Sequence, residues 1–199
     1  MEDLLGLQGR NALVTGAGRG SGRGIALTLA RAGVSVAVLD LDLASAQSVA
    51  REVEARGVSS LALSEDVTTD TGADAAIAAS VDALGDLHIG VNNVGSFGTH
   101  GPTPAVEMEW DFWQTVIDRN LKSTFFCARA MARSMQSRKV AGAIVNIASL
   151  SGLRGSPNLA PYGAAKAGIM HLTQTLALEL APNGIRVNCV GPTAIDGPS

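Results

Sequence analysis

Two residues with clear chemical potential, Tyr162 and Lys166, stand four positions apart. On a helix this spacing brings both side chains to one face. A phenol normally holds its proton up to about pH 10, but a neighbouring ammonium group favours the phenolate. Tyr162 is also the only tyrosine in the chain. The pair therefore predicts a general acid/base that takes a proton from a hydroxyl group or gives one to a carbonyl group.

Two further polar residues precede this pair. Ser149 follows an apolar run predicted to be a strand, and a hydroxyl at the carboxyl end of such a strand could hold a substrate oxygen beside Tyr162. Ser151 is a rival for this role. Asn120 lies inside a predicted helix, where asparagine is unfavourable. Its amide could hold a water that links Lys166 to solvent, or it could bend the helix, and the residue type favours neither.

A glycine-rich segment lies near the start of the chain, with glycine at every second position from Gly16 to Gly24. The segment follows the predicted strand Asn11–Thr15 and opens a helix. Its backbone N–H groups could therefore approach a pyrophosphate at the positive end of that helix. The spacing fits Thr-Gly-x-x-x-Gly-x-Gly through Gly20 and Gly22, and no register fits G-x-G-x-x-G. We predict a dinucleotide-binding turn.

The second predicted strand ends at Asp40, twenty residues after Gly20. A carboxylate here can accept hydrogen bonds from both ribose hydroxyls of an adenosine and would repel a 2′-phosphate. Arg19 favours the opposite outcome, because a guanidinium in the loop could pair with that phosphate. Asp42 is a weaker candidate for the ribose contact. Because the repulsion from Asp40 acts at close range, we predict NAD as the cofactor, in preference to NADP.

Short apolar runs alternate with amphipathic stretches along the chain, which predicts a single doubly wound α/β domain over residues 1–199 with a parallel sheet. The predicted strands are Asn11–Thr15, Val34–Leu39, Ser60–Leu63, Leu87–Asn92, Ala143–Ala148 and Ile185–Val190. The predicted helices are Gly22–Ala32, Ala44–Arg56, Asp70–Leu84, Glu109–Arg138 and Pro161–Ala181. In the fourth helix, large apolar residues recur at helical spacing, which predicts a core or helix–helix contact; they are Trp110, Trp113, Ile117, Leu121 and Phe125.

Composition excludes several classes of protein. The net charge of −3 comes without a basic stripe, which argues against a nucleic-acid partner. No apolar run reaches the ~18 residues of a membrane span, and the first ten residues do not form a signal peptide. Cys127 and Cys189 are too few for a disulfide framework, and His88, His100 and His171 lack metal-ligand spacing, so we expect no metal. We expect a cytoplasmic protein.

The ordered motifs resemble those of the short-chain dehydrogenases/reductases over Arg10–Thr193. Ser149 stands thirteen positions before Tyr162, which is the spacing of this family and favours Ser149 over Ser151. The motifs that carry the resemblance are Thr15-Gly16-x-x-x-Gly20-x-Gly22, Asp66-Val67, Asn92-Asn93-Val94-Gly95, Asn120, Ser149 and Tyr162-x-x-x-Lys166.

The resemblance implies a Rossmann fold and an oxidoreductase that interconverts a small secondary alcohol and a ketone by hydride transfer with NAD. It implies a catalytic set of Asn120, Ser149, Tyr162 and Lys166. It also implies cofactor contacts along the whole dinucleotide. These would be Gly16, Arg19, Ser21 and Gly22 at the pyrophosphate, Asp40 at the adenine ribose, Asp66 and Val67 at the adenine, Asn93 and Gly95 on the ribose side, Tyr162 and Lys166 at the nicotinamide ribose, and Pro192 and Ile195 near the nicotinamide.

Three positions depart from the family pattern. Ser21 replaces the usual isoleucine, which weakens the apolar contact under the nicotinamide. Val94 replaces a small alanine, and Thr193 replaces the glycine of a Pro-Gly pair. The family continues beyond Ser199 with a substrate loop, a helix and a seventh strand. Either such a tail continues here or the gene product is truncated, and we expect the continuation, because a sixth strand left as an open apolar edge would favour aggregation.

The resemblance further implies a homotetramer or homodimer formed through the two long helices, Glu109–Arg138 and Pro161–Ala181. Two alternative functions stay open: an NADPH-dependent reductase of 3-oxoacyl thioesters, and a dinucleotide-binding sensor or scaffold without turnover. The segments Ser96–Pro104 and Leu150–Leu159 are expected to form partly apolar walls of the substrate pocket.

Overall fold

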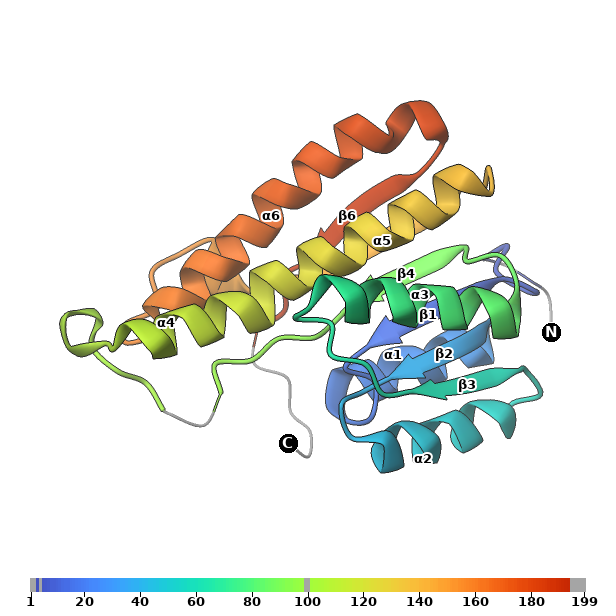
Figure 1. Ribbon diagram of the computed structural model, residues 1–199, viewed down its shortest axis with the longest axis horizontal. Helices are drawn as coiled ribbons and strands as arrows, with labels where there is room; N and C mark the ends of the chain where they lie inside the picture. Colours follow the sequence, from blue (N-terminus) through green and yellow to red (C-terminus); the bar gives the residue numbers. More distant parts are fainter. Residues whose placement is uncertain (1–2, 4, 99–100, 194–199) are drawn as a thin grey trace.

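The computed structural model describes residues 3, 5–98 and 101–193, and it contains one parallel sheet with helices on both faces (Figure 1). The strands are β1 (Asn11–Thr15), β2 (Ser35–Leu39), β3 (Ser60–Leu63), β4 (Ile89–Asn92), β5 (Ala143–Ile147) and β6 (Arg186–Val190). The α-helices are α1 (Gly20–Arg31), α2 (Leu43–Glu54), α3 (Asp70–Leu84), α4 (Trp110–Ile117), α5 (Ser123–Ser137) and α6 (Ala160–Leu180). Short 3-10 turns are η1 (Ala105–Glu107), η3 (Leu150–Gly152) and η4 (Ala181–Asn183), and η2 (Asp118–Lys122) is a π-helical turn.

The strand order is β3-β2-β1-β4-β5-β6, with every pairing parallel. The order reverses between β1 and β4, because β2 and β3 lie on one side of β1 and β4 to β6 on the other. In open α/β sheets a crevice forms at such a reversal, outside the carboxyl ends of the strands, and ligands bind there. The predicted doubly wound Rossmann fold is confirmed.

Two buried clusters fill the spaces between the sheet and its helices. On one face, α1 and α2 pack small residues, among them Ala26, Ala30 and Val49, against β1 and β2. On the other face, α3, α5 and the end of α6 pack against the sheet around Met131 and Ile144. Alanine and valine dominate the first cluster, so α1 and α2 lie close to the sheet and fix the loops at its carboxyl edge.

The predicted elements agree with the structure to within two residues at most ends, with one exception. The predicted helix Glu109–Arg138 is α4 and α5 joined through the π-helical turn η2, which contains Asn120. The apolar stripe along this helix is not core: Trp110 is 69% exposed and Phe125 38% exposed. Leu121 of the stripe faces Gly168 of α6, so the stripe borders that helix.

A chain of buried polar side chains ties α6 to the centre of the sheet. Asn92 at the end of β4 donates its amide to Asn146 Oδ1 at 2.8 Å, and Asn146 donates to Thr173 Oγ1 at 2.9 Å. Thr173 donates in turn to the Ile169 carbonyl within α6. All three side chains are buried. This chain sets the position of α6 against β5, and the sequence analysis did not foresee it.

Replacing Thr173 with valine should lower the free energy of unfolding by about 1–3 kcal/mol, because the buried Asn146 amide loses its acceptor while the packed volume is kept. Urea denaturation of the two proteins measures the change. Thr28→Val is the matched control, because Thr28 makes the same hydroxyl bond to a helix carbonyl but on an exposed surface. Equal effects of the two substitutions would show that the buried chain contributes no stability.

Candidate active site

The predicted acid/base pair lies near the start of α6. The Lys166 ammonium nitrogen stands 5.4 Å from the centroid of the Tyr162 ring, so the two side chains share a face of the helix. Tyr162 is half-buried, whereas Lys166 is 2% exposed. The tyrosine can therefore contact a ligand, while the lysine is buried beside it.

Lys166 is held in place by the sheet. Its Nζ donates a hydrogen bond of 2.8 Å to the Ile147 carbonyl at the end of β5. Burial disfavours the charged form and lowers the pKa of Lys166 from 10.5 to about 8. At neutral pH the side chain still carries its proton, so it presents a positive charge next to the phenol in a region with little solvent.

Asn120 lies on the adjoining helix in the π-helical turn. Its amide nitrogen donates to the Val116 carbonyl at 2.8 Å and to the Ser96 carbonyl at 2.9 Å. The Oδ1 atom of Asn120 is buried and has no hydrogen-bond partner among the described residues. The amide nitrogen thus engages the turn itself, while Oδ1 keeps its lone pairs for a water, so the structure fits both of the roles that the residue type left open.

Gly95 fits between Asn120 and Lys166. A β-carbon at Gly95 would lie 2.5 Å from Asn120 Oδ1 and 2.9 Å from Lys166 Nζ. Both polar atoms therefore converge on one point, and a side chain at position 95 would displace them. The predicted neighbours from the β4 loop, from η2 and from α6 are brought together here.

Ser149 follows β5 and begins the η3 turn. Its Oγ accepts a hydrogen bond of 3.2 Å from the Ser151 N–H, which leaves the Ser149 hydroxyl proton available to a ligand oxygen. The turn packs directly on α6, since a β-carbon on Gly152 would lie 2.7 Å from the backbone carbon of Lys166. This close approach holds Ser149 on the α6 side of the sheet edge.

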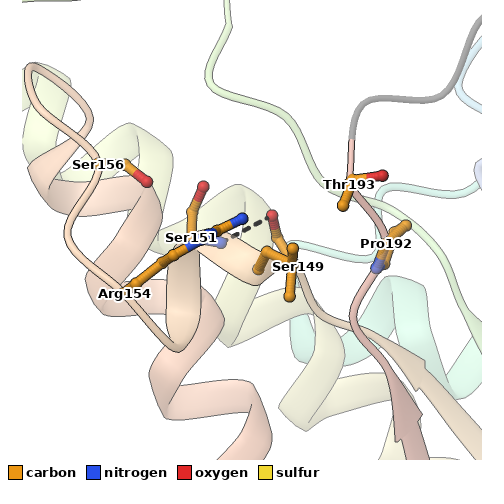
Figure 2. A pocket seen from close by; sticks show the side chains of 7 residues that line it. Ser149, Ser151, Arg154, Ser156, Pro192 and Thr193 are labelled. Atoms are coloured by element: carbon orange, nitrogen blue, oxygen red, sulfur yellow. Dashed lines mark hydrogen bonds between the residues drawn. The ribbon is translucent and has the colours of Figure 1, made fainter.

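A pocket of about 280 Å³ opens beside Ser149 (Figure 2). Serine, threonine and arginine side chains form most of its wall, together with Leu150 and Pro192. A second pocket along the same loop is lined by Leu153, Leu159 and Ala160 among others, so the walls formed by this segment are partly apolar, as expected. The residues that line the pocket beside Ser149 are Ser149, Leu150, Ser151, Arg154, Ser156, Pro192 and Thr193. The Pro192 carbonyl accepts the Leu150 N–H at 3.1 Å, which fixes the segment after β6 against η3.

The glycine-rich turn occupies the junction of β1 and α1. Arg19 is the N-cap residue of α1, and no described side chain forms a capping hydrogen bond at the start of this helix. The N–H groups of Gly20, Ser21 and Gly22 are therefore free to meet an anion. A β-carbon on Gly22 would collide with the Gly16 carbonyl, so only glycine allows the turn to fold this tightly.

Asp40 lies at the end of β2 and faces the same turn. Its Oδ2 accepts the Gly18 N–H at 2.9 Å, and its Oδ1 accepts the Asp42 N–H at 3.2 Å. Asp42 instead caps α2: its carboxylate accepts from Ser45, and these bonds hold the pKa of Asp42 below its ordinary value. Of the two acids, Asp40 is thus the one whose carboxylate lies at the edge of the glycine-rich turn.

The β1–β4 crevice is braced by a threonine that the sequence analysis quoted only as a motif residue. Thr15 Oγ1 accepts the N–H groups of Asn93 and Val94, at 3.0 and 3.2 Å. Asn93 returns its amide to the carbonyls of Thr15 and Gly16. Asn93 therefore ties the end of β4 to the glycine-rich turn.

The remaining predicted cofactor residues lie in the segments that follow β3 and β6. Asp66 accepts two hydrogen bonds from Thr68 in the turn before α3, and Val67 next to it is buried. Pro192 lies in the segment after β6. Ile195 falls outside the described residues, so the structure does not place it.

Comparison with known proteins identifies the family of this chain. The model of the short chain dehydrogenases matches residues 10–199. The chain belongs to the short-chain dehydrogenase family. The resemblance predicted from the sequence motifs is confirmed.

Relatives of this short-chain dehydrogenase differ in what their names say they act on. The 3-oxoacyl-[acyl-carrier-protein] reductase of Synechocystis sp. is 37% identical over 148 residues, 74% of this chain and 58% of that protein. An NAD+-bound xylitol dehydrogenase superposes with a TM-score of 0.92 at 34% identity, over 98% of this chain and 73% of the other. A 7α-hydroxysteroid dehydrogenase complexed with NADH and 7-oxo glycochenodeoxycholic acid gives 0.89 at 33% identity, over 96% and 72%. The chain spans less than two thirds of the length of the curated relatives it matches.

Other predicted features of this short-chain dehydrogenase have structural explanations. His88 accepts the Asn11 N–H at its Nδ1, and burial lowers its pKa. Cys127 is a buried thiol whose pKa burial raises to about 12. Within the described ranges, no three His, Cys, Asp or Glu side chains gather as a metal site would require, and no helix is both long and apolar enough to cross a bilayer.

Proposed function

We propose that this short-chain dehydrogenase is an NAD-dependent oxidoreductase that interconverts a secondary alcohol and a ketone, with Tyr162 as the general acid/base. The observation that carries the proposal is the pairing of Tyr162 with the buried Lys166 on α6. In the oxidising direction, Ser149 donates a hydrogen bond to the substrate oxygen and Tyr162 takes the hydroxyl proton. Lys166 stabilises the phenolate that accepts it.

A bound nicotinamide would supply the two-electron acceptor for the hydride of the carbinol carbon, as oxidation to a ketone requires. The residues present fit such a cofactor. The uncapped start of α1 and the glycine-rich turn offer N–H groups to a pyrophosphate. Asp40 would accept from the adenine ribose, and Lys166 would bind the nicotinamide ribose. Gly95 leaves room beside Lys166 where a side chain would intrude.

A screen of the full-length protein tests the proposal. The protein should reduce NAD with at least one compound in a panel of secondary alcohols and oxidise NADH with the matching ketone. Binding of NADH without turnover of any panel member, with the site residues intact, would favour the dinucleotide-binding sensor instead.

The cofactor preference follows from Asp40. Replacing Asp40 with alanine removes the charge that opposes a 2′-phosphate and the acceptor for the ribose hydroxyls. The variant should bind NADH about tenfold more weakly and NADPH more tightly than the unchanged protein, because a charged hydrogen bond contributes about 1.5–3 kcal/mol. Fluorescence titration with both cofactors measures the two affinities. Asp42→Ala is the matched control, because Asp42 caps α2 and should leave the preference unchanged.

A second candidate function is the NADPH-dependent reduction of 3-oxoacyl thioesters. Two observations favour it: relatives at 37–42% identity carry that name, and the exposed Arg19 lies beside the glycine-rich turn. This candidate predicts that Asp40→Ala leaves the preferred cofactor unchanged. It also predicts turnover of a 3-oxoacyl thioester with NADPH at a higher kcat/KM than any simple ketone with NADH.

A further inference from the structure

We propose that the substrate carries an anionic group, a carboxylate or a phosphate, close to its reacting carbon, and that Arg154 binds this group. The inference rests on the proposed function, because it assigns the substrate class of the same pocket. It goes further by distinguishing hydroxy and oxo acids from uncharged alcohols, sugars, steroids and long acyl chains.

Arg154 stands in the loop between η3 and α6, on the wall of the pocket that contains Ser149. In Figure 2 its side chain extends from the loop toward Ser151 and Ser149. The hydroxyl residues Ser151, Ser156 and Thr193 line the same space. A guanidinium surrounded by hydroxyl groups forms a binding surface for a small oxyanion, because it offers a planar pair of N–H donors with further donors around it.

The charge balance of the pocket points the same way. None of its described lining residues carries a carboxyl group. Three other arginines in the described part of the chain are ion-paired, namely Arg23 with Glu52, Arg129 with Asp70 and Arg138 with Asp86, whereas most are not. Arg154 forms no such ion pair with a described carboxylate. A positive charge without a protein counter-ion, beside the hydroxyl that would hold the substrate oxygen, matches a substrate that supplies the negative charge.

An uncharged or apolar substrate would gain less from this wall. An alkyl chain placed against Arg154 would strip water from the guanidinium and return no hydrogen bonds, which disfavours it relative to an acid. The wall therefore selects by charge, whereas a mainly apolar wall would select by length and shape.

The test compares matched ketone pairs on the full-length protein with NADH. Acetoacetate is paired with methyl acetoacetate, and dihydroxyacetone phosphate with dihydroxyacetone. We expect kcat/KM for the charged member of at least one pair to exceed that of its neutral partner by about tenfold or more. The pair with the larger difference distinguishes a carboxylate substrate from a phosphate substrate.

Variants then assign the preference to the arginine. Arg154→Ala should lower kcat/KM for the charged ketone by about 10–100-fold and change the neutral ketone by less than about threefold; Arg154→Lys should recover part of the loss. Arg186→Ala is the matched control, because this exposed arginine starts β6 at the opposite end of the strand from the pocket. Substrate binding is followed in parallel by quenching of bound NADH fluorescence.

The possible outcomes separate the two proposals. If ketones are reduced or bound without any charge preference, or if Arg154→Ala affects both members of a pair equally, the inference about Arg154 is overturned while the oxidoreductase activity stands. If no ketone or alcohol is turned over and Tyr162→Phe changes nothing, the proposed function itself fails.

Discussion

Tyr162→Phe should reduce kcat/KM for ketone reduction by about 10³-fold, within the 10²–10⁴-fold range of general acid/base catalysis, and leave NADH binding nearly unchanged. The substitution removes one oxygen atom and keeps the ring that lies 5.4 Å from Lys166 Nζ. The loss should fall on kcat, because proton transfer belongs to the chemical step, and only weakly on the affinity for the cofactor. Steady-state kinetics and a fluorescence titration with NADH measure the two quantities.

No other tyrosine can replace Tyr162 in the Tyr162→Phe variant, because this is the only tyrosine in the chain. Thermal unfolding should show a midpoint close to that of the unchanged protein, since the side chain is half-buried and its ring is conserved. A variant that folds, binds NADH and still reduces the ketone at more than a tenth of the original rate would contradict the role of Tyr162.

Lys166→Met should lower kcat/KM by about 10²-fold or more, because the phenolate of Tyr162 loses the positive charge that stabilises it. Unlike Tyr162→Phe, it should also weaken NADH binding, since Lys166 is expected to contact the nicotinamide ribose. Lys139→Met is the matched control: this lysine is exposed in the connection between α5 and β5, and its loss should leave the kinetics unchanged.

Lys166 also has a measurable effect on stability that does not depend on activity. Burial lowers its folded-state pKa to about 8, below the ordinary value of 10.5. Between these two pH values the unfolded chain binds more protons than the native protein, so stability rises with pH through this window. The free-energy difference between the unchanged protein and Lys166→Met, from urea denaturation, should therefore shift by up to about 3 kcal/mol in favour of the lysine between pH 8 and 10.5. A free-energy difference that stays constant across this range would mean that folding does not lower the pKa of Lys166.

Much of the fold was predictable because its signals are local. Strand β1 and the turn after it, for example, follow from an apolar run that meets closely spaced glycines. The boundary errors are small, as for β4, where Leu87 and His88 precede the paired residues rather than joining them. The π-helical turn at Asn120 was beyond prediction, because it depends on a hydrogen bond to Ser96 from another element.

The site was predictable where a residue acts through its type and spacing, as Tyr162 and Lys166 do. It was less so where a side chain acts through distant partners. Thr173 and Asn146 are unremarkable in sequence, although an asparagine inside the apolar strand β5 was a signal that a buried polar partner must exist. The polar wall beside Ser149 was likewise not predictable, because it depends on the conformation of the loop that carries Arg154. Helical or strand periodicity gives no information about the conformation of a loop.

The most direct test of hydride transfer is isotopic. The full-length protein is incubated with NAD and a secondary alcohol that carries deuterium at the carbinol carbon, and the reduced cofactor is analysed by mass spectrometry. Transfer of the deuterium to the nicotinamide ring by the unchanged protein, and its loss in Tyr162→Phe, is the predicted result. Oxidation of the alcohol without label in the cofactor, or equal labelling in Tyr162→Phe, would contradict the account.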